Sequence, residues 1–165
     1  VTFYHDEDLA HLPEFTDYSM QGRTYRYLDR TPLYPFGYGL TYADVRVLAA
    51  SAEQSADGGL TVRASVQNMG SVATEDVVQL YIRAEDSPFA TPNPILCGFA
   101  RVHLNAGESK ELSFSVAPAS LTVVDDAGNR LFPGGRYSLY VGTSQPDARS
   151  RVLTGVSPVK VELKL

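Results

Sequence analysis

Short runs in which apolar and polar residues alternate recur along most of this chain, and they constrain its fold more than any other feature. In one run, Leu60, Val62, Ala64 and Val66 are separated by polar residues. Alternation with a period of two places the apolar side chains on one face of a β-strand and the polar ones on the other. We predict strands at 60–67, 78–83, 111–116, 137–141 and 159–164, and less regular ones at 44–52, 97–104 and 121–124.

Turn-forming residues separate these runs, as in Asp57-Gly58-Gly59 and Pro133-Gly134-Gly135. No stretch has the periodicity of a convincing amphipathic helix. Seven or eight short strands with frequent turns predict an all-β fold, an immunoglobulin-like β-sandwich. The longest irregular insert, residues 84–94, contains three prolines and is predicted to cross the surface from one sheet to the other.

The first 42 residues have a different character, because they are rich in aromatic side chains and lack strand periodicity. Proline and glycine divide this segment into pieces too short for regular elements. We expect an ordered, extended segment that packs its aromatic surface against a partner, much of which lies outside the chain. Seven of the ten tyrosines of the chain fall here: Tyr4, Tyr18, Tyr25, Tyr27, Tyr34, Tyr38 and Tyr42.

Composition argues against several classes of function. The net charge of -5 and the absence of a basic run argue against nucleic-acid binding. No apolar run approaches the roughly 18–20 residues that a membrane-spanning helix needs. Cys97 is the only cysteine, so no internal disulfide can form, and we expect it to be a small core residue. The chain starts at Val1 without an initiator methionine, and we expect it to be part of a longer protein.

A search for catalytic or metal-binding patterns gives no credible set. His5 and His11 do not have the spacing of a metal motif, and His103 is expected on the outward face of a strand. Adjacent carboxylates on a strand point to opposite faces, so they are poor candidates for paired acid–base work. We therefore assign no catalytic, cofactor-binding or metal-binding residue. The carboxylate pairs are Glu75-Asp76, Glu85-Asp86 and Asp125-Asp126, the last of which is expected to form a plain turn.

Several long motifs, in the correct order, resemble the C-terminal region of glycoside hydrolase family 3, which includes β-glucosidases and β-xylosidases. The resemblance covers essentially the whole chain. It reaches from the aromatic segment into the part that resembles the family's fibronectin type III-like domain. The matching stretches are 1–4, 17–27, 32–42, 98–104, 106–109 and 140–142.

The resemblance implies a parent with a (β/α)8-like barrel, an α/β sandwich domain and a fibronectin type III-like domain. Residues 1–42 correspond to the end of the α/β sandwich domain and the interdomain linker, and residues 43–165 to the fibronectin type III-like β-sandwich. The parent is expected to hydrolyse β-glucosides or β-xylosides with retention of configuration, using two carboxylates that both lie upstream of Val1. The chain alone is then expected to be inactive, to need no cofactor, and to stabilise the contact between domains.

The expected partners are the upstream domains of the same enzyme, with neither nucleic acid nor membrane involved. An alternative is that one of the aromatic or arginine side chains of residues 1–42 reaches the rim of the parent's active site. Two further alternatives are a binding module for polysaccharide or a cell surface within 43–165, and a role in forming a homodimer of the parent. The sugar and the compartment, whether cytoplasmic, periplasmic or secreted, stay undetermined. The residues predicted to contact the upstream domains are Arg23, Tyr25, Arg26, Tyr27, Tyr34 and Phe36.

Overall fold

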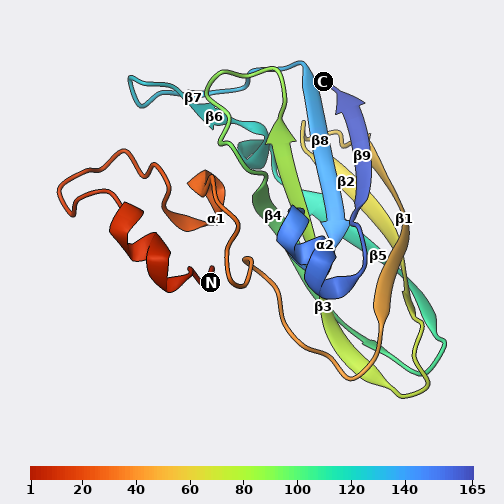
Figure 1. The fold of residues 1–165 in the computed structure, drawn as a ribbon. Coiled ribbons are helices and arrows are strands. Elements are labelled where there is room, and N and C mark those ends of the chain that lie inside the picture. The colour runs from red at the N-terminus through yellow and green to blue at the C-terminus, as the bar shows by residue number, and fades with distance from the viewer.

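The computed structural model describes all 165 residues, from Val1 to Leu165, and most of its regular structure is β-strand (Figure 1). One sheet has three antiparallel strands in the order β1–β2–β5. The all-β prediction is confirmed, and each strand of this sheet contains or overlaps a predicted run. The three strands are β1 (Val45–Gln54), β2 (Leu60–Asn68) and β5 (Ser109–Val116).

The second sheet has four antiparallel strands in the order β4–β3–β8–β9. A separate ribbon, β6 with β7, extends beyond the sheets. The predicted strand at 121–124 is realised only in part, because its first residue ends a 3-10 helix, η2 (Pro118–Leu121), and only β6 follows. The strands are β3 (Thr74–Ala84), β4 (Ile95–Leu104), β8 (Arg136–Gly142), β9 (Val159–Lys164), β6 (Val123–Val124) and β7 (Arg130–Leu131).

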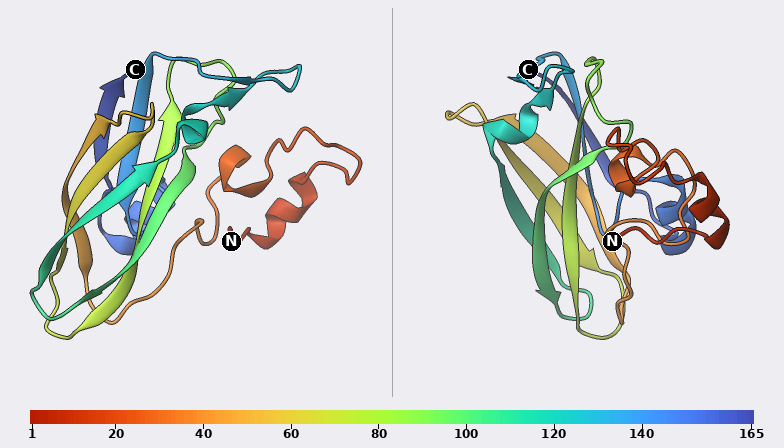
Figure 2. Two further views of the ribbon diagram at one scale, coloured as in Figure 1. Left: turned by 180° about the vertical axis from the view of Figure 1, so that it is seen from behind. Right: turned by 90° about the vertical axis from the view of Figure 1, so that its left-hand side faces the viewer.

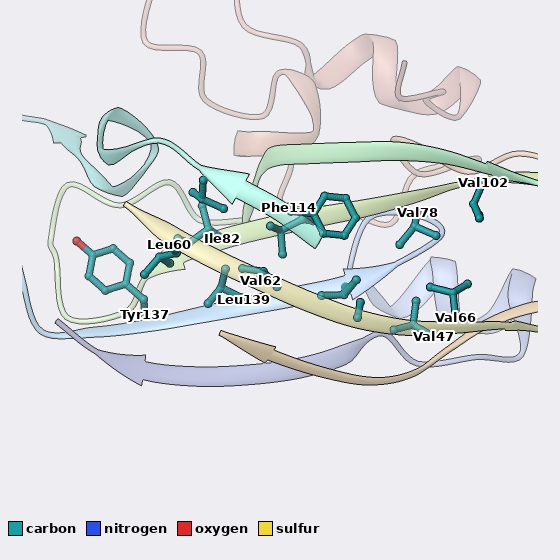
Figure 3. Close-up of a cluster of buried hydrophobic side chains, with 14 of the residues drawn as sticks. Val47, Leu60, Val62, Val66, Val78, Ile82, Val102, Phe114, Tyr137 and Leu139 are labelled. Atoms are coloured by element: carbon teal, nitrogen blue, oxygen red, sulfur yellow. The ribbon is translucent and has the colours of Figure 1, made fainter. Parts of the chain in front are cut away.

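Both sheets contribute side chains to one hydrophobic core (Figure 3). Leu60 and Val62 of β2 face Leu80 of β3 and Leu139 of β8 across this core, and all four are completely buried. Burying one such aliphatic side chain contributes about 1.5–3 kcal/mol relative to leaving it exposed. The apolar residues of the alternating runs are therefore the ones that point into the core.

The insert between β3 and β4 departs from the prediction. It does not cross between sheets, because β3 and β4 are hydrogen-bonded neighbours of the same sheet. The register runs from Thr74 opposite Leu104 to Ile82 opposite Ile95, so the insert is a wide hairpin connection. Its three prolines prevent strand pairing within the insert, and the sequence therefore shows a long irregular segment that resembles a crossover between sheets.

Helix α2 (Ala148–Thr154) has no counterpart among the predicted elements. It begins after Asp147, whose Oδ1 accepts the backbone N–H of Ser150 at 2.6 Å. It ends at Gly155, which adopts a left-handed φ of 70°. An aspartate N-cap and a glycine after the last turn are strong end signals for a helix. The helix is defined by these caps and is too short to show a periodic apolar face.

The first 42 residues lie against the four-stranded sheet, on the side away from the core (Figure 2). They contain two short helical pieces, η1 (Asp6–His11) and α1 (Thr24–Tyr27). A β-bridge joins Phe3 to Tyr34, so the start of this segment returns to its later part. The later part of the segment is thus folded onto the sheet through Tyr25 and Phe36. Other aromatic side chains of the segment stay exposed, namely Phe3, Phe15, Tyr18, Tyr34 and Tyr42.

Candidate functional site

The three histidines do not come together into one metal-binding or catalytic site. His5 precedes η1 and His11 ends it, while His103 lies on β4 with an exposed side chain 3.9 Å from Glu75. The outward position predicted for His103 is confirmed. No group of three or more His, Cys, Asp or Glu side chains in the structure is arranged to hold a metal ion. None of its helices is both long and apolar enough to cross a membrane.

Most of the paired carboxylates are engaged in local structure. Glu75 forms an ion pair with Arg101 on the neighbouring strand. Asp86 accepts hydrogen bonds from the guanidinium of Arg136, which lowers the pKa of that carboxyl. Asp125 accepts backbone N–H groups within its own turn, as the plain-turn prediction requires. These groups hold strand ends and turns together.

Cys97 packs against the core from β4 and is partly buried, as predicted for a small core residue. Its Sγ lies 3.4 Å from the carbonyl oxygen of Leu80. Burial raises the pKa of the Cys97 thiol to about 12. Because the thiolate is the nucleophilic form, this residue is chemically inert near neutral pH.

The most developed surface feature is the contact between the sheet and residues 22–42, which we call the aromatic strap. Tyr25 is 8% exposed and stacks on Phe36, with ring centroids 4.1 Å apart. Both rings meet the edge of Tyr81 on β3, at centroid distances of 6.2 and 6.5 Å. Stacked and edge-to-face aromatic pairs each contribute about 0.5–1.5 kcal/mol beyond their buried area. The three rings form one cluster on the outer face of the sheet.

A polar network accompanies this cluster. The Tyr81 hydroxyl donates to Gln79 Oε1 at 2.6 Å, and Gln79 Nε2 donates to the carbonyl oxygens of Gly37 and Thr143, each at 2.9 Å. Burial raises the pKa of Tyr81, so its hydroxyl stays a donor throughout the physiological range. Gly37 has a φ of 77°, and a Cβ there would lie 2.0 Å from Gln79 Oε1. Only glycine permits this close approach.

Two further residues fix the backbone of the strap. Asn93 Nδ2 donates to the carbonyl oxygens of Tyr25 and Leu28, at 2.9 and 2.7 Å. The backbone N–H of Gln145 donates to the carbonyl oxygen of Phe36 at 3.0 Å. The Tyr25 hydroxyl in turn accepts the N–H of Leu96 at 3.0 Å. The strap is therefore held from the β3–β4 insert, from β4 and from the loop before α2.

One sequence signal for this contact exists. Gln79 and Tyr81 occupy the outward phase of the alternation that buries Val78 and Leu80. Both are nonetheless buried, and Tyr81 is completely so. A tyrosine on an otherwise polar strand face indicates that another layer covers that face.

The structure divides the six residues expected to contact upstream domains. Tyr25 and Phe36 pack on the chain's own sheet, and Arg23 donates to the carbonyl oxygens of Pro13 and Glu14. These three side chains make contacts within the chain, and their predicted contacts with upstream domains stay a prediction. The Arg26 guanidinium lies 5.8 Å from the centre of the Tyr25 ring. Tyr34 is 43% exposed and stacks on Tyr38, and Tyr27 is half-buried.

An open hollow of about 610 Å³ adjoins the strap and is lined by Tyr4, Tyr27 and Phe36 among others. Met20 and Thr24 also line it, and both have positive φ angles, 62° and 56°. A left-handed conformation is unfavourable for a β-branched residue such as threonine. At Thr24 the Tyr4 hydroxyl accepts the backbone N–H at 2.8 Å, which helps to hold this conformation. Aromatic, methionine and arginine side chains together are typical of protein interfaces.

Replacing Phe36 by alanine should release the strap without unfolding the sheets. The stack with Tyr25 and the T-shaped contact with Tyr81 would be lost. The backbone around Arg26 and Arg30, whose side chains are already exposed, would then become mobile enough for trypsin to cleave. We expect cleavage of the native chain in the strap to accelerate about tenfold or more, which corresponds to about 1.4 kcal/mol of local stability. Tyr42→Ala is the matched control, because Tyr42 is 94% exposed and should not change the cleavage rate. Equal rates of tryptic cleavage in the two variants would refute the role of Phe36 in holding the aromatic strap on the sheet.

Asp76 gives a prediction with a defined pH dependence. Burial raises its pKa above the ordinary value of 3.8, so the ionised form destabilises the folded chain at neutral pH. Asp76→Asn should therefore raise the unfolding midpoint at pH 7, and the gain should vanish as the pH falls towards 3.8. The Asn oxygen can still accept the Val77 N–H that Asp76 accepts at 2.7 Å. Glu111→Gln, at an exposed position, should show no such trend in parallel denaturant titrations; a pH-independent gain at Asp76 would contradict this reading.

The chain has clear similarity to known proteins. Residues 76–145 match the Fn3-like family, described as a fibronectin type III-like domain. A xylan 1,4-beta-xylosidase of Xylanibacter ruminicola is 40% identical over 157 residues, which are 93% of this chain and 18% of the relative. The beta-glucosidase BoGH3A of Bacteroides ovatus is 32% identical over 135 residues, which are 78% of this chain and 18% of the relative.

Solved structures agree with these sequence matches. The structure of a GH3 beta-glucosidase from Bifidobacterium adolescentis superposes with a TM-score of 0.71 at 27% identity, covering 86% of this chain and 20% of that one. The chain spans only about a fifth of the length of the relatives it matches. It is therefore similar to the C-terminal part of glycoside hydrolase family 3 enzymes, and its residues 76–145 match the fibronectin type III-like domain family.

Proposed function

We propose that this chain is the non-catalytic C-terminal part of a retaining β-glycosidase, and that it stabilises the contact between domains of that enzyme. The observation that carries the proposal is the aromatic strap. It is bonded along one side to the four-stranded sheet through Tyr25, Phe36 and Gly37. Chain that leaves a preceding domain through such a strap is held at a fixed place on the next domain.

The proposal also divides the chain into two parts. Residues 1–42 are the end of the preceding α/β sandwich domain and the linker, and residues 43–165 are a fibronectin type III-like β-sandwich. The seven longer strands, β1 to β5 with β8 and β9, form the sandwich, and the ribbon of β6 and β7 is an excursion from it. One core shared by both sheets supports this arrangement.

The outer side of the first segment supplies the surface for the upstream domains. Phe15 is 89% exposed and Tyr18 is 87% exposed, although buried aromatic side chains are the rule in a stable fold. Phe3 and Tyr34 are also exposed, and we infer that in the parent these aromatic side chains and the hollow beside the strap pack against the catalytic domains. Surfaces of this kind mark sites of protein association.

The substrates of the parent are β-glucosides or β-xylosides, a proposal that rests on the names of the relatives. A carbohydrate-binding module within 43–165 is the competing function. The exposed aromatic side chains argue for the interdomain role, because five lie in residues 1–42 and three in the rest: Phe3, Phe15, Tyr18, Tyr34 and Tyr42, against Phe89, Phe99 and Phe132. Retention of residues 43–165 on insoluble glycans would favour the module instead.

The chain by itself should not hydrolyse aryl β-glucosides or aryl β-xylosides. Retaining hydrolysis needs two carboxyl groups about 5–5.5 Å apart on either side of the scissile bond. Here the adjacent carboxylates are held in turns and ion pairs on strand ends. The assay is release of nitrophenol by the purified 165-residue chain, with a full-length relative as positive control. Turnover that follows the chain through successive purification steps would refute the proposal.

A further inference from the structure

A small cavity lies where the loops on either side of α2 meet the start of β1 and the end of β8. Its volume is about 20 Å³, and the residues that line it include Val47, Val141, Gln145 and Ser150. A cavity needs about 10–15 Å³ to hold one water molecule. The space is therefore large enough to hold a water molecule.

Two buried polar atoms belong to the residues that line this cavity. Gln145 is 5% exposed and Ser150 is 2% exposed. Gln145 Oε1 and Ser150 Oγ are both completely buried, and neither has a hydrogen-bond partner in the chain. Burying a polar atom without a hydrogen-bond partner is unfavourable, so such atoms are normally satisfied by a partner or by ordered water.

We propose that this cavity is a binding site for a single structural water, which donates to Gln145 Oε1 and exchanges a hydrogen bond with Ser150 Oγ. Water fits better than a cation, because no aspartate or glutamate lines the cavity and hard cations prefer carboxylate oxygens. The remaining polar lining, from Thr143 and Ser157 among others, offers the third contact that buried waters usually make.

The position of Gln145 gives this water a role in holding the strap. The backbone N–H of Gln145 donates to Phe36 at 3.0 Å, and its side-chain Nε2 lies 3.5 Å from the carbonyl oxygen of Tyr25. Water bound at Oε1 fixes the amide in the orientation that points Nε2 towards Tyr25. The water thereby connects Ser150 of α2 to Gln145, and Gln145 in turn contacts the aromatic strap on the outer face of the sheet. This inference does not depend on the proposed function.

A high-resolution crystal structure of the 165-residue chain tests the site directly. We expect one water within about 3.2 Å of both Gln145 Oε1 and Ser150 Oγ. An empty cavity, a metal ion with short oxygen distances, or a direct bond between the two side chains would each overturn the proposal.

A variant tests the link to the strap. Ser150→Ala removes only the hydroxyl, because the hydrogen bonds to Asp147 and from Thr154 use the backbone of Ser150. We expect water occupancy to fall and the amide hydrogen of Gln145 to exchange about tenfold faster or more. Ser115→Ala, at an exposed position on β5, is the control and should change neither quantity. Unchanged exchange at Gln145 in Ser150→Ala would overturn the link.

Discussion

The packing of Tyr25 and Phe36 on Tyr81 is the contact on which the arrangement of the whole chain depends. It covers Tyr81, a completely buried aromatic ring on the outer face of the four-stranded sheet, whereas Phe99 on the neighbouring strand β4 stays 69% exposed. Without this cover, Tyr81 and the amide of Gln79 would lie on an open sheet face. With it, an irregular segment that has almost no regular backbone pairing becomes a fixed layer of the structure.

Polar contacts make this aromatic packing specific. The Gln79 amide binds the carbonyl oxygen of Gly37, and Asn93 binds those of Tyr25 and Leu28. Backbone oxygens in irregular chain need such partners, because buried carbonyl groups that lack a hydrogen bond are costly. The apolar rings supply most of the free energy of association, and the amides determine which residues of the strap meet which strand. Together they fix the direction in which chain arriving from a preceding domain meets the sheet.

The strands were predictable because alternation alone determines their inward faces, as at Leu60 and Leu80. The contact between the strap and the sheet was not predictable, because alternation shows which side chains point outward but not which segment covers them. The one signal in the sequence was Tyr81, a large aromatic residue at an outward strand position, which indicates that another layer covers that face. The hairpin between β3 and β4 was misjudged since prolines conceal the pairing of the strands on either side. Helix α2 was missed because its ends are set by Asp147 and Gly155 while its seven residues show no periodic face.

Solution NMR of the 165-residue chain tests the central claim most directly. Rings whose centroids lie 4.1 to 6.5 Å apart bring protons close enough for nuclear Overhauser effects. The account predicts such effects between the ring protons of Tyr25, Phe36 and Tyr81, together with a slowly exchanging amide at Leu96, whose N–H binds the Tyr25 hydroxyl. Absence of these effects, with random-coil shifts for the strap beside a folded sheet, would contradict it.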